Sequence, residues 1–275
     1  MNLWEAFAAF ILGLVEGLTE FAPVSSTGHM IIVDDAWFQT KNLFTPQAAN
    51  TFKVVIQLGS ILAVVVLMRD RFMNLLGLKK LPGQDEGGPR LNLLQVIVGL
   101  IPFGVLGVLF EDYIDEYLFS TRTVVIGLVL GAVLMLVAEW RRPSVPKTDT
   151  VDRMTYKQAL GMGLFQCLAM WPGFSRSGST ISGGVLLGLS HRAAADFTFI
   201  MAVPIMAGAS FLKLLKSWDS IPAEAIPFFA VGFVSAFVFG LISIRFFLKL
   251  INRIKLVPFA IYRLVLAAVI YMVLL

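Results

Sequence analysis

Long apolar runs separated by short polar stretches make up most of this 275-residue chain. An α-helix needs roughly 20 apolar residues to cross the hydrocarbon core of a bilayer. Runs of about that length lie at 50–69, 93–110, 123–140, 195–213, 226–248 and 257–275. The pattern predicts an all-α polytopic membrane protein with six full spans. Polar loops are expected at 72–92 and at the acidic segment 111–116.

Two further apolar segments are too short to span a bilayer. Residues 3–15 give only about 13 apolar positions, and Pro23 then stops the helix before a second short piece that ends near Asp34. Residues 158–190 repeat this design, with a break at 171–173. Two half-length helices that meet at a polar kink predict a re-entrant hairpin, whose broken backbone must line a protein cavity rather than lipid.

Shifting the sequence by 150 positions reveals an internal repeat. The matched pairs are Gly13 with Gly163, Leu14 with Leu164, Leu18 with Leu168, Ser25 with Ser175 and Gly28 with Gly178. Each half then holds one hairpin and three spans, and because three is odd, the second half must be inverted relative to the first. We therefore expect a single membrane domain, 1–275, with an inverted-topology repeat. Its halves, 1–140 and 158–275, are joined by a cytoplasmic linker, 141–157, and its special sites lie near the midplane.

Composition agrees with a membrane protein and excludes an ordinary soluble domain. The chain is 57% hydrophobic and 15% charged, with a mean hydropathy of +0.82. Its net charge of +4 does not indicate nucleic-acid binding, because membrane proteins carry basic residues in cytoplasmic loops for topological reasons. The single cysteine, Cys167, excludes an intramolecular disulfide. No cleavable signal peptide is expected, because the apolar start lacks a basic leader and carries Glu5.

The distribution of basic residues favours one orientation. If loop 69–92 is cytoplasmic, fifteen fall on that side: Arg69, Arg71, Lys79, Lys80, Arg90, Arg141, Arg142, Lys147, Arg153, Lys157, Arg192, Arg245, Lys249, Arg253 and Lys255. Five fall on the other: Lys41, Lys53, Arg122, Lys213 and Lys216. By the positive-inside rule both termini are then outside, with the first hairpin entering from outside and the second from inside.

Two carboxylates lie within the first short helix. Glu16 and Glu20 are spaced i, i+4, so they share one helix face and can reach a common ligand. Ionisable groups at membrane depth are costly and therefore indicate function. An unpaired couple would repel, so one carboxyl is protonated or a cation bridges them. A hard divalent ion, Mg²⁺ or Ca²⁺, is the expected cofactor, and a water-filled cleft without metal is the alternative.

Hydroxyl-rich segments begin the second helix of each hairpin. Ser25, Ser26, Thr27 and Gly28 follow the first break, and Ser175, Arg176, Ser177, Gly178, Ser179 and Thr180 follow the second. A helix N-terminus presents unpaired N–H groups and a positive dipole end, and hence suits an anion. Capping explains one hydroxyl in each segment but not several. Arg176 is suited to a bidentate grip on phosphate, and an ion pair with Glu16 or Glu20 is compatible with that role.

His29, in the first turn after the hydroxyls, is the expected general acid or base, with a buried structural histidine as the alternative. Carboxylates, a guanidinium, hydroxyl-rich helix starts and a histidine together predict a polyanionic ligand with a metal. Because the whole arrangement lies in a membrane, the ligand is expected to be a lipid phosphate or diphosphate.

The segment from Glu16 to His29 and the segment from Pro172 to Thr180 resemble the two signature motifs of the bacterial undecaprenyl-diphosphatase (bacitracin-resistance protein) family. The resemblance covers essentially the whole chain, including Ile-Gln-Leu-Gly at 56–59. It implies a multi-pass inner-membrane enzyme that removes the terminal phosphate of undecaprenyl diphosphate and so recycles the lipid carrier for cell-wall synthesis. It also implies dependence on a divalent metal, a site open to the periplasmic side and resistance to bacitracin.

By position in these motifs, the functional residues are Glu16, Glu20, Ser25, Ser26, Thr27, His29 and Arg176, supported by Ser175 and Ser177. We expect Glu16 and Glu20 to hold the metal, while Arg176 and both helix starts, including Gly28 and Gly178, bind phosphate. Ser26 is the preferred nucleophile, with His29 as its base or as the acid for the leaving group. Attack by an activated water stays open as the alternative.

A transporter is the rival interpretation, because inverted repeats with broken helices are a transporter design. A lipid-carrier flippase or ion-coupled exporter would use the same carboxylates for coupling, but would not require Arg176 beside His29 and hydroxyls. A channel is less favoured, because both hairpins carry bulky apolar flanks. The sequence leaves open the number of metals and the oligomeric state, with a homodimer among the alternatives.

Overall fold

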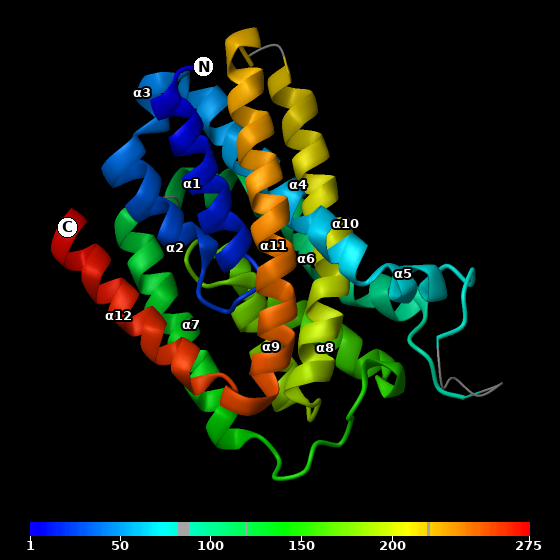
Figure 1. The fold of residues 1–275 in the computed structure, drawn as a ribbon. Coiled ribbons are helices and arrows are strands. Elements are labelled where there is room, and N and C mark those ends of the chain that lie inside the picture. The colour runs from blue at the N-terminus through cyan, green and yellow to red at the C-terminus, as the bar shows by residue number, and fades with distance from the viewer. Residues whose placement is uncertain (82–87, 119, 219–220) are drawn as a thin grey trace.

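The structure, a computed structural model, describes residues 1–81, 88–118, 120–218 and 221–275, with every side chain in these ranges except those of residues 111, 112, 115 and 116. The α-helices are α1 (Leu3–Thr19), α2 (Ser26–Met30), α3 (Thr40–Leu43), α4 (Pro46–Leu67), α5 (Arg69–Leu75), α6 (Leu93–Tyr117), α7 (Thr121–Arg141), α8 (Tyr156–Cys167), α9 (Arg176–Leu186), α10 (His191–Ser217), α11 (Ile226–Ile254) and α12 (Val257–Leu274) (Figure 1). A π-helix spans Ile31–Phe38, and 3₁₀ turns span Val151–Arg153, Leu168–Met170 and Ala223–Ala225. Within the described ranges there is no strand, only an isolated bridge between Thr148 and Leu189.

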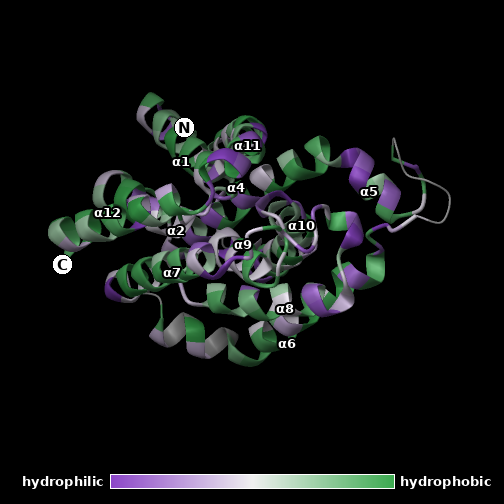
Figure 2. Ribbon diagram, turned by 90° about the horizontal axis from the view of Figure 1, so that it is seen from below, coloured by the Kyte–Doolittle hydropathy of each residue, from purple (hydrophilic) through white to green (hydrophobic). Residues whose placement is uncertain are grey.

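Six helices of the described chain are long and apolar enough to cross a membrane. They are Pro46–Leu67, Leu93–Phe110, Thr121–Arg141, His191–Ser217, Ala223–Ile254 and Val257–Leu274. The six predicted spans are thus confirmed, and the fold is that of an all-α polytopic membrane protein. Figure 2 shows α6, α7 and α12, on the outside of the bundle in that view, largely in the green of hydrophobic residues.

Two helices end early, at the breaks that the sequence predicts. The first turn separates α1 from α2, and the second separates α8 and its 3₁₀ extension from α9. Capping boxes begin α1 at Asn2 and α8 at Thr155. Because each box satisfies unpaired backbone donors locally, the start of both helices is specified by the adjacent sequence.

Small residues bring the helices of the two halves together. Helix α1 lies along α11, α12 lies along α7 (Figure 1), and α8 packs on α6. A Cβ on Gly13 would overlap the carbonyl oxygen of Gly232 in α11, and a Cβ on Gly163 would overlap that of Gly99 in α6. Ser235 Oγ of α11 also donates to the Phe10 carbonyl at 2.7 Å. Close backbone approach and interhelical hydrogen bonds are the usual basis of helix association in membranes.

The helix after the first break is longer than predicted. Instead of ending near Asp34, it continues as a π-helix to Phe38. The Asp34 side chain is buried, and it forms an ion pair with Lys53 Nζ at 2.6 Å and accepts from the Thr40 backbone at 3.0 Å. Because its charge is compensated by a cation on α4, the carboxylate does not have to reach water and the helix can continue.

Two predicted loops are also partly helical. The loop expected over 72–92 begins inside α5, and the acidic segment 111–116 belongs to α6, which ends at Tyr117. The 25 residues of α6 make a helix of about 37 Å, longer than a hydrocarbon core of roughly 30 Å. The apolar pattern therefore ends before the helix does, and sequence hydropathy places the boundary too early.

Candidate active site

The two breaks place equivalent serines at the start of α2 and of α9. Ser25 has φ 71° and its Oγ accepts from Gly28 N at 3.3 Å, while Ser175 has φ 73° and its Oγ accepts from Gly178 N at 3.1 Å. A positive φ is uncommon for a residue with a side chain and persists only where the surroundings enforce it. In each turn the serine hydroxyl caps the N-terminus of its own helix, and a helix N-terminus suits an anion.

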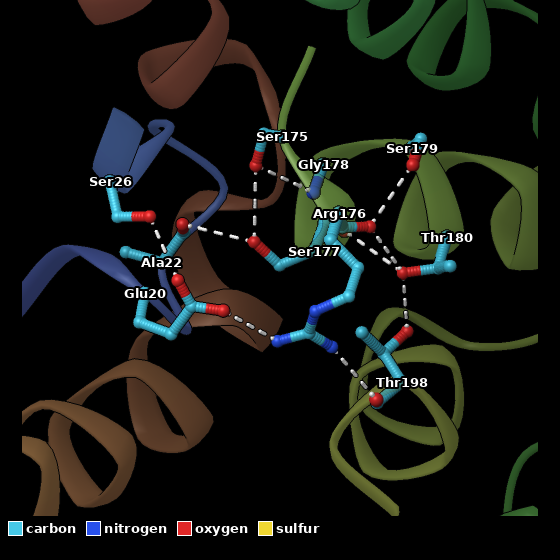
Figure 3. Close-up of polar contacts among 10 residues, drawn as sticks. All are labelled: Glu20, Ala22, Ser26, Ser175, Arg176, Ser177, Gly178, Ser179, Thr180 and Thr198. Atoms are coloured by element: carbon cyan, nitrogen blue, oxygen red, sulfur yellow. Dashed lines mark hydrogen bonds and ion pairs between the residues drawn. The ribbon is translucent and has the colours of Figure 1, made fainter. Parts of the chain in front are cut away.

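Glu20 is the residue on which the two halves converge (Figure 3). Its Oε2 accepts from Ser26 Oγ at 2.8 Å, and its Oε1 accepts from Arg176 Nη2 at 2.9 Å. The side chains of Glu20 and Arg176 are only 8% and 11% exposed. A predicted nucleophile, a carboxylate and a fixed positive charge therefore form one continuous chain of contacts.

A second contact joins the turns directly. Ser177 Oγ donates to the Ala22 carbonyl at 3.1 Å, and Ser175 Oγ lies 3.2 Å from Ser177 Oγ (Figure 3). The backbone of one break is thus held by a side chain of the other. Ser175 and Ser177, to which the sequence assigns a supporting part, form a pair of hydroxyls that connects the turns.

Arg176 is oriented by residues that the sequence did not single out for this purpose. Its carbonyl accepts from Thr180 Oγ1 at 2.7 Å, and Thr198 Oγ1 of α10 donates to Thr180 Oγ1 at 3.0 Å. The Thr198 carbonyl in turn accepts from Arg176 Nη1 at 3.4 Å (Figure 3). The sequence signal for Thr198 was a hydroxyl residue inside an apolar span, and the structure buries it fully.

Glu16 lies one helical turn before Glu20 and is 2% exposed. Its Oε1 has no hydrogen-bond partner in the described structure, and it lies within electrostatic range of Glu20 and Arg176. No group of three His, Cys, Asp or Glu side chains able to hold a metal gathers in the described ranges. A buried carboxylate oxygen without a partner still fits Mg²⁺ chemistry, because that ion is often bound by one or two carboxylates, with phosphate and water completing its shell.

Both ring nitrogens of His29 have partners other than the Ser26 hydroxyl. Its Nδ1 lies 2.8 Å from the Ser25 carbonyl and its Nε2 lies 2.7 Å from the hydroxyl of Tyr262 in α12. Since a carbonyl only accepts, Nδ1 carries a proton, and a neutral ring accepts the Tyr262 proton at Nε2. Glu20, and not His29, thus receives the Ser26 hydrogen bond. The sequence did not predict Tyr262 as a partner of His29, because a single tyrosine near the end of a membrane span is common.

Arg263, next in the sequence, is fully buried in α12. Its Nη2 donates to the carbonyls of Gly173 at 2.9 Å and Gly127 at 3.2 Å, so it fastens the second break to α7. No carboxylate of the described chain pairs with it. The remaining predicted residues, Thr27 and Gly28, lie in the first turn of α2, where Gly28 packs against Leu128 and Leu266.

The assembled geometry suits charge-stabilised transfer of a phosphoryl group. It combines one hydroxyl bonded to a carboxylate, one guanidinium, and the N-termini of two helices that begin at the breaks. Catalysis of phosphoryl transfer depends mainly on positioning the reactants and on neutralising the negative charge of the transferred oxygens. The described structure brings Glu20 into direct contact with Ser26 and Arg176, while Ser177 bonds the Ala22 carbonyl and Glu16 lies one helical turn before Glu20.

Comparison with known proteins agrees with this assignment of chemistry. A family model described as "Bacitracin resistance protein BacA" matches residues 9–269. The undecaprenyl-diphosphatase of Geobacillus sp. (strain WCH70) is 70% identical over 273 residues, 99% of each chain. That of Bacillus subtilis (strain 168) is 65% identical over 274 residues, again 99% of each chain. Undecaprenyl-diphosphatase 2 of Bacillus licheniformis is 67% identical over 272 residues, which are 98% of this chain and 99% of the relative.

Proposed function

Because this chain belongs to the bacitracin resistance protein BacA family, we propose that it hydrolyses undecaprenyl diphosphate to undecaprenyl phosphate and inorganic phosphate. Its relatives along the whole chain are named for this substrate. The observation that carries the proposal in this molecule is the chain of contacts from Ser26 through Glu20 to Arg176. In a bacterial membrane the reaction returns the lipid carrier for cell-wall synthesis, and an abundant enzyme opposes bacitracin.

We assign the proton of Ser26 to Glu20, since that carboxylate already accepts the hydroxyl hydrogen bond. Ser26 Oγ then forms a bond to the terminal phosphorus, and the bond from this phosphorus to the bridging oxygen breaks. Undecaprenyl phosphate leaves with the electron pair. Water cleaves the phosphoserine, releasing inorganic phosphate and restoring the Ser26 hydroxyl. Direct attack by water is the alternative, with Glu20 as the base that activates it.

Arg176 and the N-termini of α2 and α9 stabilise the negative charge on the transferred group. Donors that are already oriented in a partly dry site lower the barrier most, because they need no reorganisation during the reaction. We assign His29 to proton exchange with the leaving group rather than to the role of base for Ser26, because its Nε2 is bonded to the Tyr262 hydroxyl. Ser25 and Ser175 hold the two N-termini in position.

A divalent cation, Mg²⁺ or Ca²⁺, is part of this proposal. Glu16 would hold it together with Glu20, and the unpartnered Glu16 Oε1 supports that assignment. When bound, such an ion neutralises charge on the diphosphate. We expect chelation by EDTA to abolish phosphate release and Mg²⁺ to restore it. Glu16→Gln should raise the Mg²⁺ concentration needed for half-maximal activity by about tenfold or more, since Mg²⁺ relies on few carboxylates. An unchanged requirement would remove Glu16 from the metal site.

We propose that the two broken helix pairs are re-entrant hairpins of an inverted repeat. The packing supports this, because α1 lies on α11 as α8 lies on α6, which is the relation expected for two halves related by a pseudo-two-fold axis. The glycine pairs Gly13–Gly232 and Gly163–Gly99 repeat the same close approach. With the basic residues inside, the first hairpin opens to the periplasmic side, and we assign hydrolysis to that side.

The same packing symmetry keeps a transporter of lipid carrier as the second candidate. Phosphate release separates the two, because detergent micelles have no two sides for transport. We expect the purified chain to release phosphate from undecaprenyl diphosphate in micelles. A chain that binds the lipid but releases no phosphate with Mg²⁺ present would support the transporter.

Ser26→Ala tests the nucleophile. We expect activity to fall on the order of 10³-fold or more, because removal of a nucleophile typically abolishes the covalent route. Acid quenching during turnover should trap phosphate on Ser26 in the wild type. An active Ser26→Ala enzyme would exclude the serine route, and direct attack by water would then be the mechanism. Ser190→Ala, which removes a capping hydroxyl at the start of α10, is the matched control.

A further inference from the structure

A cavity of about 580 Å³ lies away from the proposed active site, where α4, α5, α10 and α11 meet. Four basic side chains line it, Arg71, Arg192, Arg245 and Lys249, together with two acidic ones, Asp70 and Asp196. The rest of the lining is apolar and includes Leu67, Ile244 and Leu248. Nothing in the proposed reaction uses this cavity.

The two acidic residues are already neutralised by other contacts. Asp196 pairs with Arg192 Nε at 3.0 Å, and Asp70 pairs with Lys79 Nζ at 2.7 Å. Arg71 is bound to Asp152 at 2.6 Å. These ion pairs cancel the charges of Asp70, Asp196, Arg71 and Arg192. The positive charge that remains in the cavity lining comes from α11.

That excess belongs to Arg245 and Lys249. They are spaced i, i+4, so they lie side by side on one face of α11, and both are exposed. Neither pairs with a carboxylate of the described chain. Two like charges at this spacing destabilise a helix, and this cost is offset when an anion binds between them.

The position of the cavity along α11 matches the depth expected for lipid headgroups. Arg245 lies 19 positions after Ile226, the first residue of α11, which is about 29 Å along the helix and close to the thickness of the hydrocarbon core. Ile242 and Phe246, on either side of Arg245, are 53% and 64% exposed. An anion that binds here therefore has basic groups for its phosphate and apolar side chains for its chain.

We propose that this cavity binds the phosphate headgroup of an anionic membrane phospholipid, with Arg245 and Lys249 as its principal ligands. Arg192 fixes the wall, because its Nη1 donates to the Leu248 carbonyl at 3.1 Å and so ties α10 to α11 between the two ligands. Basic pockets between transmembrane helices are typical sites for such headgroups. An apolar wall and exposed apolar neighbours favour a lipid over free phosphate.

Native mass spectrometry of the full chain, released from nanodiscs of mixed phosphatidylglycerol and phosphatidylcholine, tests the proposal. We expect the wild type to retain phosphatidylglycerol preferentially. The double variant Arg245→Gln/Lys249→Gln should bind it roughly 30-fold more weakly, because each basic side chain near an anionic surface is worth about a fivefold change in affinity. Lys213→Gln/Lys216→Gln, near the opposite end of α10, removes the same charge and should retain wild-type binding.

The conservative variant Arg245→Lys/Lys249→Arg keeps the charge and should keep the lipid, which separates loss of binding from loss of fold. Equal retention of phosphatidylglycerol by the wild type and the Gln double variant would overturn the proposal. So would an equal loss in the Lys213/Lys216 control. Titration with inorganic phosphate then distinguishes a lipid site from a site for free phosphate. If phosphate displaces the lipid at equal concentration, or binds while no phospholipid is preferred, the site is a free-phosphate site and the lipid assignment is wrong.

Discussion

At the scale of single residues, Glu20 decides how the site works. The sequence suggests that Glu16 and Glu20 act alike, because they share a helix face. In the structure Glu20 is occupied by Ser26 and Arg176, whereas Glu16 retains an unpartnered oxygen. Two carboxylates one turn apart thus have different environments, and different environments permit different roles.

Arg176→Ala is expected to lower kcat by roughly 10²- to 10³-fold, the usual cost of one oriented donor to the transferred charge. The change also leaves Glu20 buried without its cation, so melting temperature should fall as well. Arg176→Lys keeps a charge but loses the fork that reaches both Glu20 and Thr198, and should recover stability more than kcat. Phosphate release and thermal unfolding in detergent measure both effects. Near-normal kcat in the alanine variant would refute the assigned role.

At the scale of elements, the helix breaks could be predicted and their partners could not. Proline, glycine and short apolar runs predict the two turns. The 150-residue shift shows that the two turns have similar sequences. The partners of His29 and of the second turn come from α12, as Tyr262 and Arg263, some 90 or more positions away. The local sequence pattern around His29 or the second turn does not indicate which side chain of a distant helix will contact it. The buried Asp34–Lys53 pair, which lets the π-helix continue, was hidden for the same reason.

Gly13→Ala tests the contact between α1 and α11. The added methyl group would overlap the Gly232 carbonyl, so the helices must separate, at a cost of about 1–3 kcal/mol in stability. Because α1 carries Glu16 and leads directly into Glu20, activity should fall together with stability. Gly104→Ala in α6 is the control, since nothing lies within 4 Å of its added Cβ. It should leave stability unchanged or raise it slightly. Equal thermal unfolding of the two variants would contradict tight packing at Gly13.

At the scale of the whole molecule, the site belongs to neither half alone. Ser26 and Glu20 come from the first half and Arg176 from the second, and Ser177 donates to the Ala22 carbonyl across the boundary. The sequence predicted this division from the copy of the first motif that lies 150 positions later. It did not predict that the two turns touch directly, because that depends on how closely the helices pack.

Cutting the chain after Ser144, in the exposed segment between α7 and α8, tests that division. Each fragment expressed alone should lack phosphatase activity, since each lacks part of the Ser26–Glu20–Arg176 contact. Co-expression of both fragments should restore measurable activity, because the interface between them is formed by whole helices. Phosphate release from purified membranes measures the outcome. Activity in either fragment alone would show that one half suffices.

The packing of α1 on α11 also determines when, during synthesis of the chain, the active site can form. Helix α1 is among the first segments to leave the ribosome, yet the helix that covers its glycine face begins only at Ile226. At ordinary rates of translation the delay is about 10 to 40 s. Throughout that interval α1, which carries Glu16, lacks its main neighbour. The enzyme can therefore become competent only after its last two helices have been inserted.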